Sequence, residues 1–451
     1  MSAKADRTAH PPDARPPAQD WRLLLAVFWI TSLVEGLGVS QIFAFVPAYL
    51  RDMGVAEPDR LHFVGLFSSL LFVVGMPLVP LWGVWADKYS RKAVIIRSSI
   101  VEAVVFAAVA LSREPWQLAG SMLLIGFQLG NTGIMLGAIR DATPRVRLGT
   151  ALALFGVSGP IGFAVGPALG GVIVDGLHWG LPAVFAVSAG LSIGTALLVG
   201  LGSREVRPEV VPTGRTVELA FGALRSVLGD PAVRRIFAIF GTAFLAQQVA
   251  RPYLPVVVGQ VNGPVGEASA IGLVAGTAAL AGALIAPIGG PLGDRIGFRP
   301  VLVAALLGGG ITLGVMPFAP SVASLAIVAL AFSAFYGVVS PMVFGLLATE
   351  VPPERRSQTL NLVYLPLYGA GVIGPTLGAA VVSAGISAPF LLGAAVFLAG
   401  AVGVALRLRG TRARSREAPG DEVRPDEVRP HEVRPDEARV DEIDANRRSA
   451  G

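Results

Sequence analysis

Long apolar segments, separated by short clusters of charged residues, run along most of this 451-residue chain. A helix of 18 or more apolar residues is long enough to cross a bilayer core about 30 Å thick. Twelve segments qualify: 22–50, 61–84, 93–111, 117–139, 150–174, 181–202, 234–258, 268–290, 301–318, 323–347, 357–382 and 387–408. The pattern therefore predicts an all-α membrane protein with twelve transmembrane helices.

Composition supports a membrane protein and excludes several other classes. Charged residues make up only 15% of the chain, against about 25% in soluble domains. Cysteine is absent, which excludes disulfides and thiolate chemistry. None of the lysines (Lys4, Lys88, Lys92) follows the Gly-rich loop of an ATP site. With no metal-ligand cluster and no nucleophile–base pair, we expect neither an enzyme nor a metal or cofactor.

Basic residues predict the orientation of the chain, because cytoplasmic loops are enriched in Lys and Arg. The loops after the even-numbered segments hold sixteen such residues, whereas the odd-numbered loops hold only Arg51, Arg60 and Arg113. Both termini are therefore expected in the cytoplasm. The net charge of +5 reflects arginine at membrane boundaries, so we expect no nucleic-acid partner.

The distribution of apolar segments predicts five regions. Residues 1–20 and 410–451 are expected to be disordered cytoplasmic termini, because they hold too few apolar residues to bury a core. In the second of these, Glu-Val-Arg-Pro recurs from Glu422 to Pro435. Two six-helix bundles are expected at 21–202 and 232–409. A cytoplasmic linker, 203–231, joins them.

The two predicted bundles repeat each other. Asp294 lies 207 positions after Asp87, each in a Gly-rich loop with basic residues. Pro375 lies 208 positions after Pro167, each inside a Gly-Pro-x-x-Gly sequence. Such repeats are typical of transporters built by duplication.

These motifs resemble those of the major facilitator superfamily over roughly residues 20–408, and most closely its twelve-helix drug:proton antiporters. The loop motif comprises Gly83, Asp87, Lys88, Arg91 and Lys92, with Gly290, Asp294, Arg295 and Arg299 in the second half. The antiporter motif of the fifth predicted helix retains Gly162, Gly166, Pro167, Gly170 and Gly171.

The resemblance implies two pseudo-symmetric six-helix bundles that work by alternating access. It further implies that Asp87, Arg91 and Asp294 latch a cytoplasmic gate; the alternative is that they only fix topology and turn shape. Gly162, Gly166 and Gly170 are four residues apart and share one helix face. We expect that face to pack closely and slide against the eighth predicted helix (268–290); the alternative is static close packing.

Three positions depart from the family pattern. Ala153 and Ser90 replace glycines of the two motifs. Gly126 stands where the family's fourth helix usually carries an arginine that is implicated in proton coupling. Its absence leaves the coupling mechanism open, though not the fold.

Charges inside a membrane helix cost about 3 kcal/mol each and are functional candidates. Glu35 and Glu102 lie near the middle of their segments, and a carboxyl group that gains and loses a proton suits proton coupling. Arg251 is expected either to pair with Glu35 or to contact an anionic substrate. For each of these residues the alternative is a structural contact between helices, which for Glu102 would be a pair with Arg97 or with a polar neighbour.

Further polar residues are candidates for the lining of a substrate cavity, since amides and aromatic groups suit amphipathic ligands. For each of them alone, ordinary hydrogen bonding or packing between helices is the alternative. They are Gln41, Gln128, Asn131, Gln247, Gln248, Tyr336, Asn361, Tyr364 and Tyr368.

The sequence as a whole predicts a monomeric secondary active transporter of the cytoplasmic membrane. We expect it to export small amphipathic compounds or drugs in exchange for protons. The alternatives are a dedicated exporter of a metabolite, siderophore or antibiotic, an uptake carrier, and a non-transporting membrane sensor or scaffold.

Overall fold

The computed structural model describes residues 20–208, 211–350 and 365–417. The chain divides into a large compact unit, Met1–Leu406, and a second unit, Arg407–Gly451. Of the segments 1–20 and 410–451 that were predicted to be disordered, residues 1–19 and 418–451 lie outside the described residues, and residues 410–417 belong to the helix α18 (Ala388–Glu417). The proposed boundaries of the bundles, linker and termini stay predictions.

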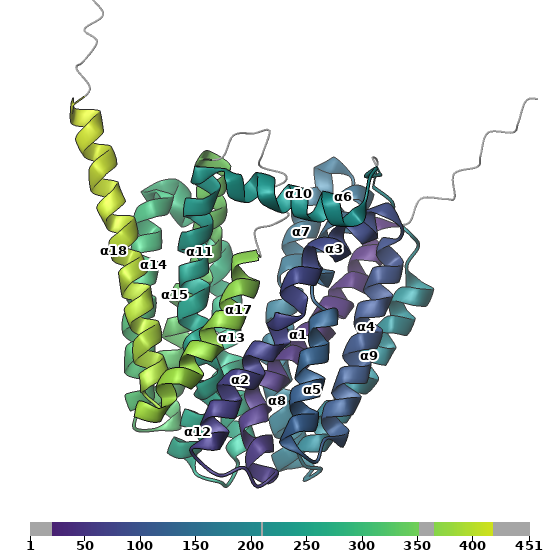
Figure 1. Ribbon diagram of the computed structural model, residues 1–451, viewed down its shortest axis with the longest axis vertical. Coiled ribbons are helices and arrows are strands. Elements are labelled where there is room, and N and C mark those ends of the chain that lie inside the picture. The colour runs from purple at the N-terminus through teal and green to yellow at the C-terminus, as the bar shows by residue number, and fades with distance from the viewer. Residues whose placement is uncertain (1–19, 209–210, 351–364, 418–451) are drawn as a thin grey trace, which may run out of the picture. The chain divides into compact units, whose positions relative to one another are not determined.

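The first half is helical from Trp21 to Gly202 (Figure 1). Its elements are α1 (Trp21–Asp52), α2 (Asp59–Val73), α3 (Gly75–Lys88), α4 (Arg91–Leu111), α5 (Pro115–Leu124), the 3-10 helix η1 (Ile125–Phe127), α6 (Asn131–Ala142), the 3-10 helix η2 (Arg145–Arg147), α7 (Leu148–Gly156), α8 (Ser158–Gly171), the π-helix η3 (Val172–Gly176) and α9 (Leu181–Gly202).

The second half is helical in the same way. After α10 (Thr216–Gly229), its elements are α11 (Pro231–Ala250), η4 (Arg251–Tyr253), α12 (Leu254–Asn262), α13 (Glu267–Ile296), α14 (Phe298–Val315), η5 (Met316–Phe318), α15 (Val322–Glu350), α17 (Leu365–Val381), η6 (Val382–Ala384) and α18 (Ala388–Glu417).

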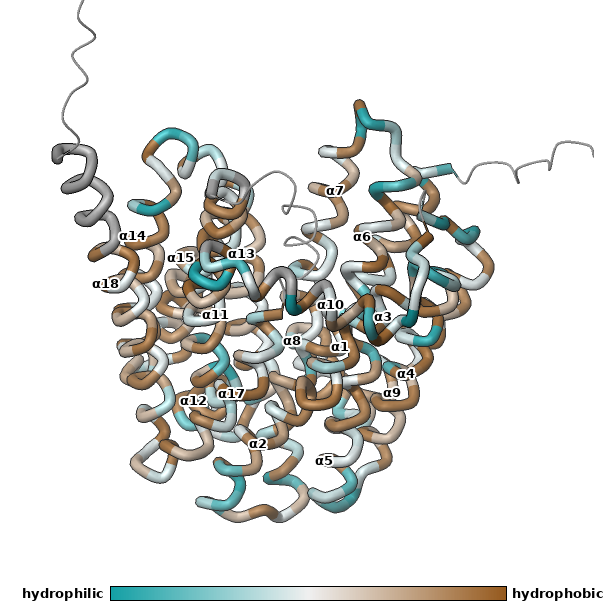
Figure 2. Tube along the Cα trace, turned by 45° about the horizontal axis from the view of Figure 1, so that its top comes forward, coloured by the Kyte–Doolittle hydropathy of each residue, from teal (hydrophilic) through white to brown (hydrophobic). Residues whose placement is uncertain are grey.

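Within the described residues, eleven helices are long and apolar enough to cross a membrane, and they match eleven of the predicted segments. The segment missing from this set is 234–258. It does form helix, as α11, η4 and α12, but Arg234, Arg235, Gln247 and Gln248 lower its hydropathy. Figure 2 shows hydrophobic residues along the helices and hydrophilic ones at the loops. The all-α membrane architecture is therefore confirmed.

Several membrane helices are broken, and the sequence explains where. Proline lacks the N–H that would bond to the carbonyl four residues earlier. Helix α2 ends at Val73, four residues before Pro77, and α11 gives way to η4 at Arg251, four residues before Pro255. Gly130, with φ +94°, separates η1 from α6 in a left-handed conformation that favours glycine. Such breaks are tolerated in membrane helices because neighbouring helices and side chains can satisfy the freed backbone groups.

Helix α8 packs between α1 of its own half and α13 of the other half. A Cβ atom at Gly162 or Gly166 would collide with backbone atoms of Leu33 or Leu37 in α1. The expectation that this glycine face meets the eighth predicted helix is therefore wrong. The three glycines Gly162, Gly166 and Gly170 pack against α1 instead. The neighbouring face of α8 packs against α13, where Gly171 contacts Ala268 and Ser269 at the start of that helix.

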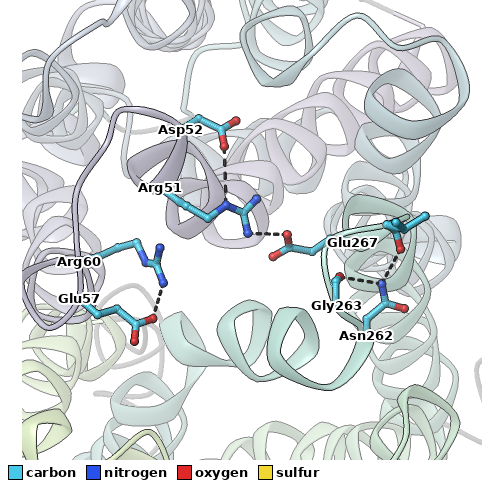
Figure 3. Close-up of polar contacts among 8 residues, drawn as sticks. Arg51, Asp52, Glu57, Arg60, Asn262, Gly263 and Glu267 are labelled. Carbon is cyan, nitrogen blue, oxygen red and sulfur yellow. Dashed lines mark hydrogen bonds and ion pairs between the residues drawn. The ribbon is translucent and has the colours of Figure 1, made fainter.

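Contacts between the halves cluster at the end of the molecule opposite the loop motifs. There Arg51 Nη1 and Glu267 Oε2 form a 2.6 Å ion pair from α1 to α13 (Figure 3). The Asp175 carboxylate accepts a 2.6 Å hydrogen bond from the Ser269 N–H in the first turn of α13. Nearer the middle, Ser69 of α2 and Thr376 of α17 share a 2.8 Å hydrogen bond. We call this the opposite end, and the end with the loop motifs the basic end.

The region between the halves contains a helix of its own. Figure 1 shows α10 crossing the basic end, where it contacts α3. The predicted linker, 203–231, thus includes an amphipathic helix against the first half.

Replacing Gly162 by alanine should destabilise the protein. The added methyl group meets backbone of α1 that has no room to move, and overpacking costs about 1–3 kcal/mol. Gly194→Ala in α9 is the matched control, since nothing lies within 4 Å of a Cβ there. Thermal unfolding in detergent should show a lower midpoint for Gly162→Ala only. Equal midpoints for the two variants would contradict the close contact between α1 and α8.

Candidate functional site

Glu35 lies in the middle of α1, facing the broken fourth membrane helix. Its Oε2 atom accepts a 3.2 Å hydrogen bond from Asn131 Nδ2 at the first turn of α6. Asn131 is 2% exposed, and its Oδ1 atom has no hydrogen-bond partner in the described part of the chain. The break in the helix thus brings a polar residue to Glu35.

Glu102 of α4 is buried behind α1, close to Glu35. Its side chain is 2% exposed, its Oε1 atom lies near Gly38 of α1, and Oε1 has no described hydrogen-bond partner. Ser192 of α9 lies near this carboxyl group but donates its hydroxyl proton to the Ser188 carbonyl at 3.0 Å, and Glu35 is near enough to interact with Glu102 electrostatically. Two acids from different helices therefore share one buried region.

The alternative that Glu102 pairs with Arg97 is wrong. The Arg97 guanidinium lies 3.7 Å from the ring centroid of Trp82 and donates a 2.8 Å hydrogen bond to Ser98 Oγ. Ser98 in turn donates to the Gln128 carbonyl at 3.1 Å. Within the described residues, neither Glu35 nor Glu102 forms an ion pair.

Gln128 and Gly126 flank the break in the fourth membrane helix. The amide group of Gln128 is buried, and neither of its polar atoms has a hydrogen-bond partner among the described residues. Gly126 packs against the backbone of Gly75, so a side chain there would collide with α2 and α3. This close crossing is a physical reason why the arginine of the family pattern is absent.

Arg251 occupies the break in the seventh membrane helix and contacts the other half of the molecule. Its guanidinium lies 3.9 Å from the ring centroid of Phe43 in α1 and 5.0 Å from that of Phe163 in α8. Its one hydrogen bond within the described chain is a 3.4 Å contact to Gln248 Oε1. The expectation that Arg251 pairs with Glu35 is therefore not met in this conformation.

The remaining polar candidates have different environments. Gln41 is fully buried, donates to the Gly166 carbonyl at 3.2 Å and accepts from Ser188, so its amide joins α1, α8 and α9. Tyr336 packs on Phe244 and Phe332. Gln247 is half-buried in α11.

Tyr368 lies 6.5 Å from Phe72, measured between ring centroids. Asn361 and Tyr364 lie outside the described residues.

The first loop motif forms a network of charges within its own half. Arg91, almost fully buried, pairs with Asp87 at 2.8 Å and with Asp141 of α6 at 2.7 Å. Arg140 adds a 2.9 Å contact to Asp141. The network joins α3, α4 and α6 at the basic end.

Ser90, which departs from the family glycine, begins α4. Its Oγ atom accepts a 3.0 Å hydrogen bond from Ala93 N and donates to Glu205, whose other oxygen accepts from Arg91 N at 2.9 Å. A carboxylate at a helix N-terminus is stabilised by the helix dipole. Lys92 donates to the Gly200 and Ser203 carbonyls at 2.7 and 2.6 Å, and Lys88 donates to the Gly214 carbonyl at 2.6 Å. The motif is therefore hydrogen-bonded to the C-terminal end of α9 and to the predicted linker.

In the second loop motif, Asp294 differs from its counterpart Asp87, which pairs with Arg91. Asp294 and Arg295 are exposed, and neither forms an ion pair within the described residues. Gly290 has open space beside it. The two loops therefore differ in their contacts although their sequences correspond.

Sequence reasoning missed several residues of the site. Ser188, Ser192 and Thr195 line one face of α9 beside the acids, and their spacing of four and three residues was the available signal. Nothing in the sequence marked Phe43 and Phe163 as partners of Arg251, because apolar residues at helical spacing are usually core.

Comparison with known proteins agrees with the architecture. The model of the Major Facilitator Superfamily matches residues 28–266 and again 265–440. The chain is 28% identical over 389 residues to multidrug resistance protein MdtG of Salmonella typhi, covering 85% of this chain and 95% of that protein. The chain is also 28% identical over 405 residues to MdtG of Enterobacter lignolyticus, covering 88% of this chain and 95% of that protein.

A solved structure has the same fold. The crystal structure of a mutant of the nucleoside transporter NupG aligns with a TM-score of 0.70 at 15% identity, covering 86% of this chain and 99% of that one. The duplicated family match spans both halves, as the repeated loop and Gly-Pro motifs predicted. The chain therefore belongs to the Major Facilitator Superfamily.

Proposed function

We propose that this integral, multi-pass membrane protein exports small amphipathic compounds or drugs from the cytoplasm in exchange for protons. The observation that carries the proposal is the buried pair of acids, Glu35 and Glu102, in the middle of the first half. The names of its relatives, multidrug resistance proteins, support drugs as the class of substrate. No catalytic step is part of this proposal.

The acid pair is suited to carry a proton. A proton bound between two neighbouring carboxylates removes their repulsion, and removing a charge from the membrane interior lowers the cost of burial. Asn131 donates to one oxygen of Glu35, and Oε1 of Glu102 is buried without a hydrogen-bond partner among the described residues. Proton binding would thus change the charge beside α1 and the break in the fourth membrane helix.

The places where the halves touch support alternating access. The ion pair and the hydrogen bond at the opposite end favour a conformation closed at that end. With the basic end in the cytoplasm, as the positive-inside rule predicts, both termini are cytoplasmic and this conformation is closed towards the outside. Because one chain supplies both halves, we propose that it acts as a monomer.

Glu35→Gln and Glu102→Gln should each abolish proton-driven transport, because glutamine keeps the shape but cannot exchange a proton. Proteoliposomes with an acidic lumen should accumulate fluorescent amphipathic dyes, from a panel that includes cations and zwitterions. Accumulation by either variant should fall to the level of protein-free liposomes. Glu218→Gln, at an exposed side chain of α10, is the matched control and should transport like the wild type.

Two outcomes would contradict parts of this proposal. Normal gradient-driven transport by both glutamine variants, folded as judged by thermal unfolding, would remove the acid pair as the proton carrier. A wild-type protein that moves no dye of the panel would instead favour a dedicated exporter of one metabolite.

A disulfide between Ser69→Cys and Thr376→Cys should lock the halves and stop transport. The two native hydroxyl oxygens are 2.8 Å apart, and the chain has no cysteine of its own, so the introduced pair is the sole thiol pair. Mild oxidation should abolish dye accumulation, and a reducing agent should restore it. Each single-cysteine variant should be insensitive to oxidation; undiminished transport by fully cross-linked protein would argue against movement of α2 relative to α17.

A further inference from the structure

Arg251 is a cation that lies where the two halves meet, and it pairs with no acid of the described residues. The two acids of the buried pair, Glu35 and Glu102, belong to the first half, whereas Arg251 belongs to the second. None of the ion pairs among the described residues includes Arg251. A charge at membrane depth without a protein counter-ion is costly, so an external anion would stabilise it.

The aromatic rings hold the guanidinium and leave its hydrogen-bond donors available. Phe43 and Phe163 lie 3.9 and 5.0 Å from it, measured to their ring centroids. A guanidinium attracts an aromatic face through its charge, and its five N–H donors point outwards in its own plane. Its single hydrogen bond, 3.4 Å to Gln248, is long, so these donors are almost unused.

Further unused donors lie on the residues that surround Arg251. Gln248 is 1% exposed, and the Nε2 atom of the amide that faces Arg251 has no hydrogen-bond partner within the described chain. The hydroxyl group of Tyr336, which is near enough to Arg251 to interact with it electrostatically, is also buried without a described partner. A guanidinium, an amide N–H and a phenol are the donors that recognise a carboxylate.

We propose that Arg251 binds an anionic oxygen group, most simply a carboxylate, of the transported compound. The substrates of this chain are then amphipathic anions or zwitterions, with the apolar part of the molecule free to contact aromatic residues such as Phe43 and Phe163. This inference rests on the proposed transport function and names its substrate class. It places the bound anion where residues of both halves meet.

The experiment compares two dyes that differ by one carboxylate. Rhodamine B carries the free acid and its ethyl ester lacks it, and fluorescence polarisation measures the binding of each to the full-length protein in detergent. The wild type should bind the acid at least about tenfold more tightly, the size of a hydrogen bond to a charged group. Arg251→Gln should lose this preference by weakening the binding of the acid and sparing that of the ester.

Two further variants sharpen the comparison. Arg97→Gln removes another cation that stacks on an aromatic ring, Trp82, and should keep the preference for the acid. Arg251→Lys keeps the charge but loses the planar pair of donors, so it should retain a reduced preference. If Arg251→Gln does not fold, as judged by thermal unfolding, the reduced preference of Arg251→Lys tests the proposal by itself.

The outcomes that overturn the proposal are specific. A wild type that binds neither dye, or binds acid and ester equally, excludes a carboxylate site at Arg251. Equal weakening of both dyes by Arg251→Gln would indicate a structural role. Because binding is measured without a proton gradient, this inference and the transport function fail separately.

Discussion

In the hydrocarbon core of a bilayer, apolar side chains gain little by leaving lipid, so helices associate through close packing. The contact of α8 with the backbones of α1 and α13 is the place where this constraint is strictest. Gly162 and Gly166 admit the backbone of α1, and the carbonyls of Ala164 and Pro167 lie against Gly276 and Gly272 of α13. Because α8 touches both halves, this packing fixes the helix that carries Glu35 and also joins the two bundles.

The breaks in the membrane helices distribute the polar groups about this packed centre. Pro255 interrupts the seventh membrane helix where Arg251 emerges, and Gly130 interrupts the fourth where Asn131 reaches Glu35. The two buried acids, Glu35 and Glu102, lie in the first half, and Arg251 lies in the second. Under the proposed function, a rocking of the halves would change the distance between these opposite charges and so couple proton binding to movement without a permanent ion pair.

Much of this arrangement was readable from the sequence, because membrane helices reveal themselves by length and hydropathy, and the repeated motifs identified the family. The central position of Glu35 followed from counting along its segment. The direction in which each side chain faces could not be predicted, because it depends on packing between segments far apart in the chain. Only the structure shows that Asn131, 96 positions along the chain from Glu35, contacts that residue. Only the structure shows that the helix face with Gly162 packs against α1. The environment of Arg251 was hidden because phenylalanines carry no polar signal.

The departures from the family pattern are explained by local contacts. Ser90 replaces a glycine but caps the N-terminus of α4, because its hydroxyl group accepts a hydrogen bond from Ala93 N and donates one to Glu205. Gly126 replaces an arginine where the backbone of Gly75 leaves no room for a side chain. Without that arginine, and with Arg97 held on Trp82, no described cation neutralises Glu35 or Glu102. Under the proposed function, neutralisation of the acids falls to the proton itself, so that proton binding, rather than exchange between ion pairs, would change the charge of the first half.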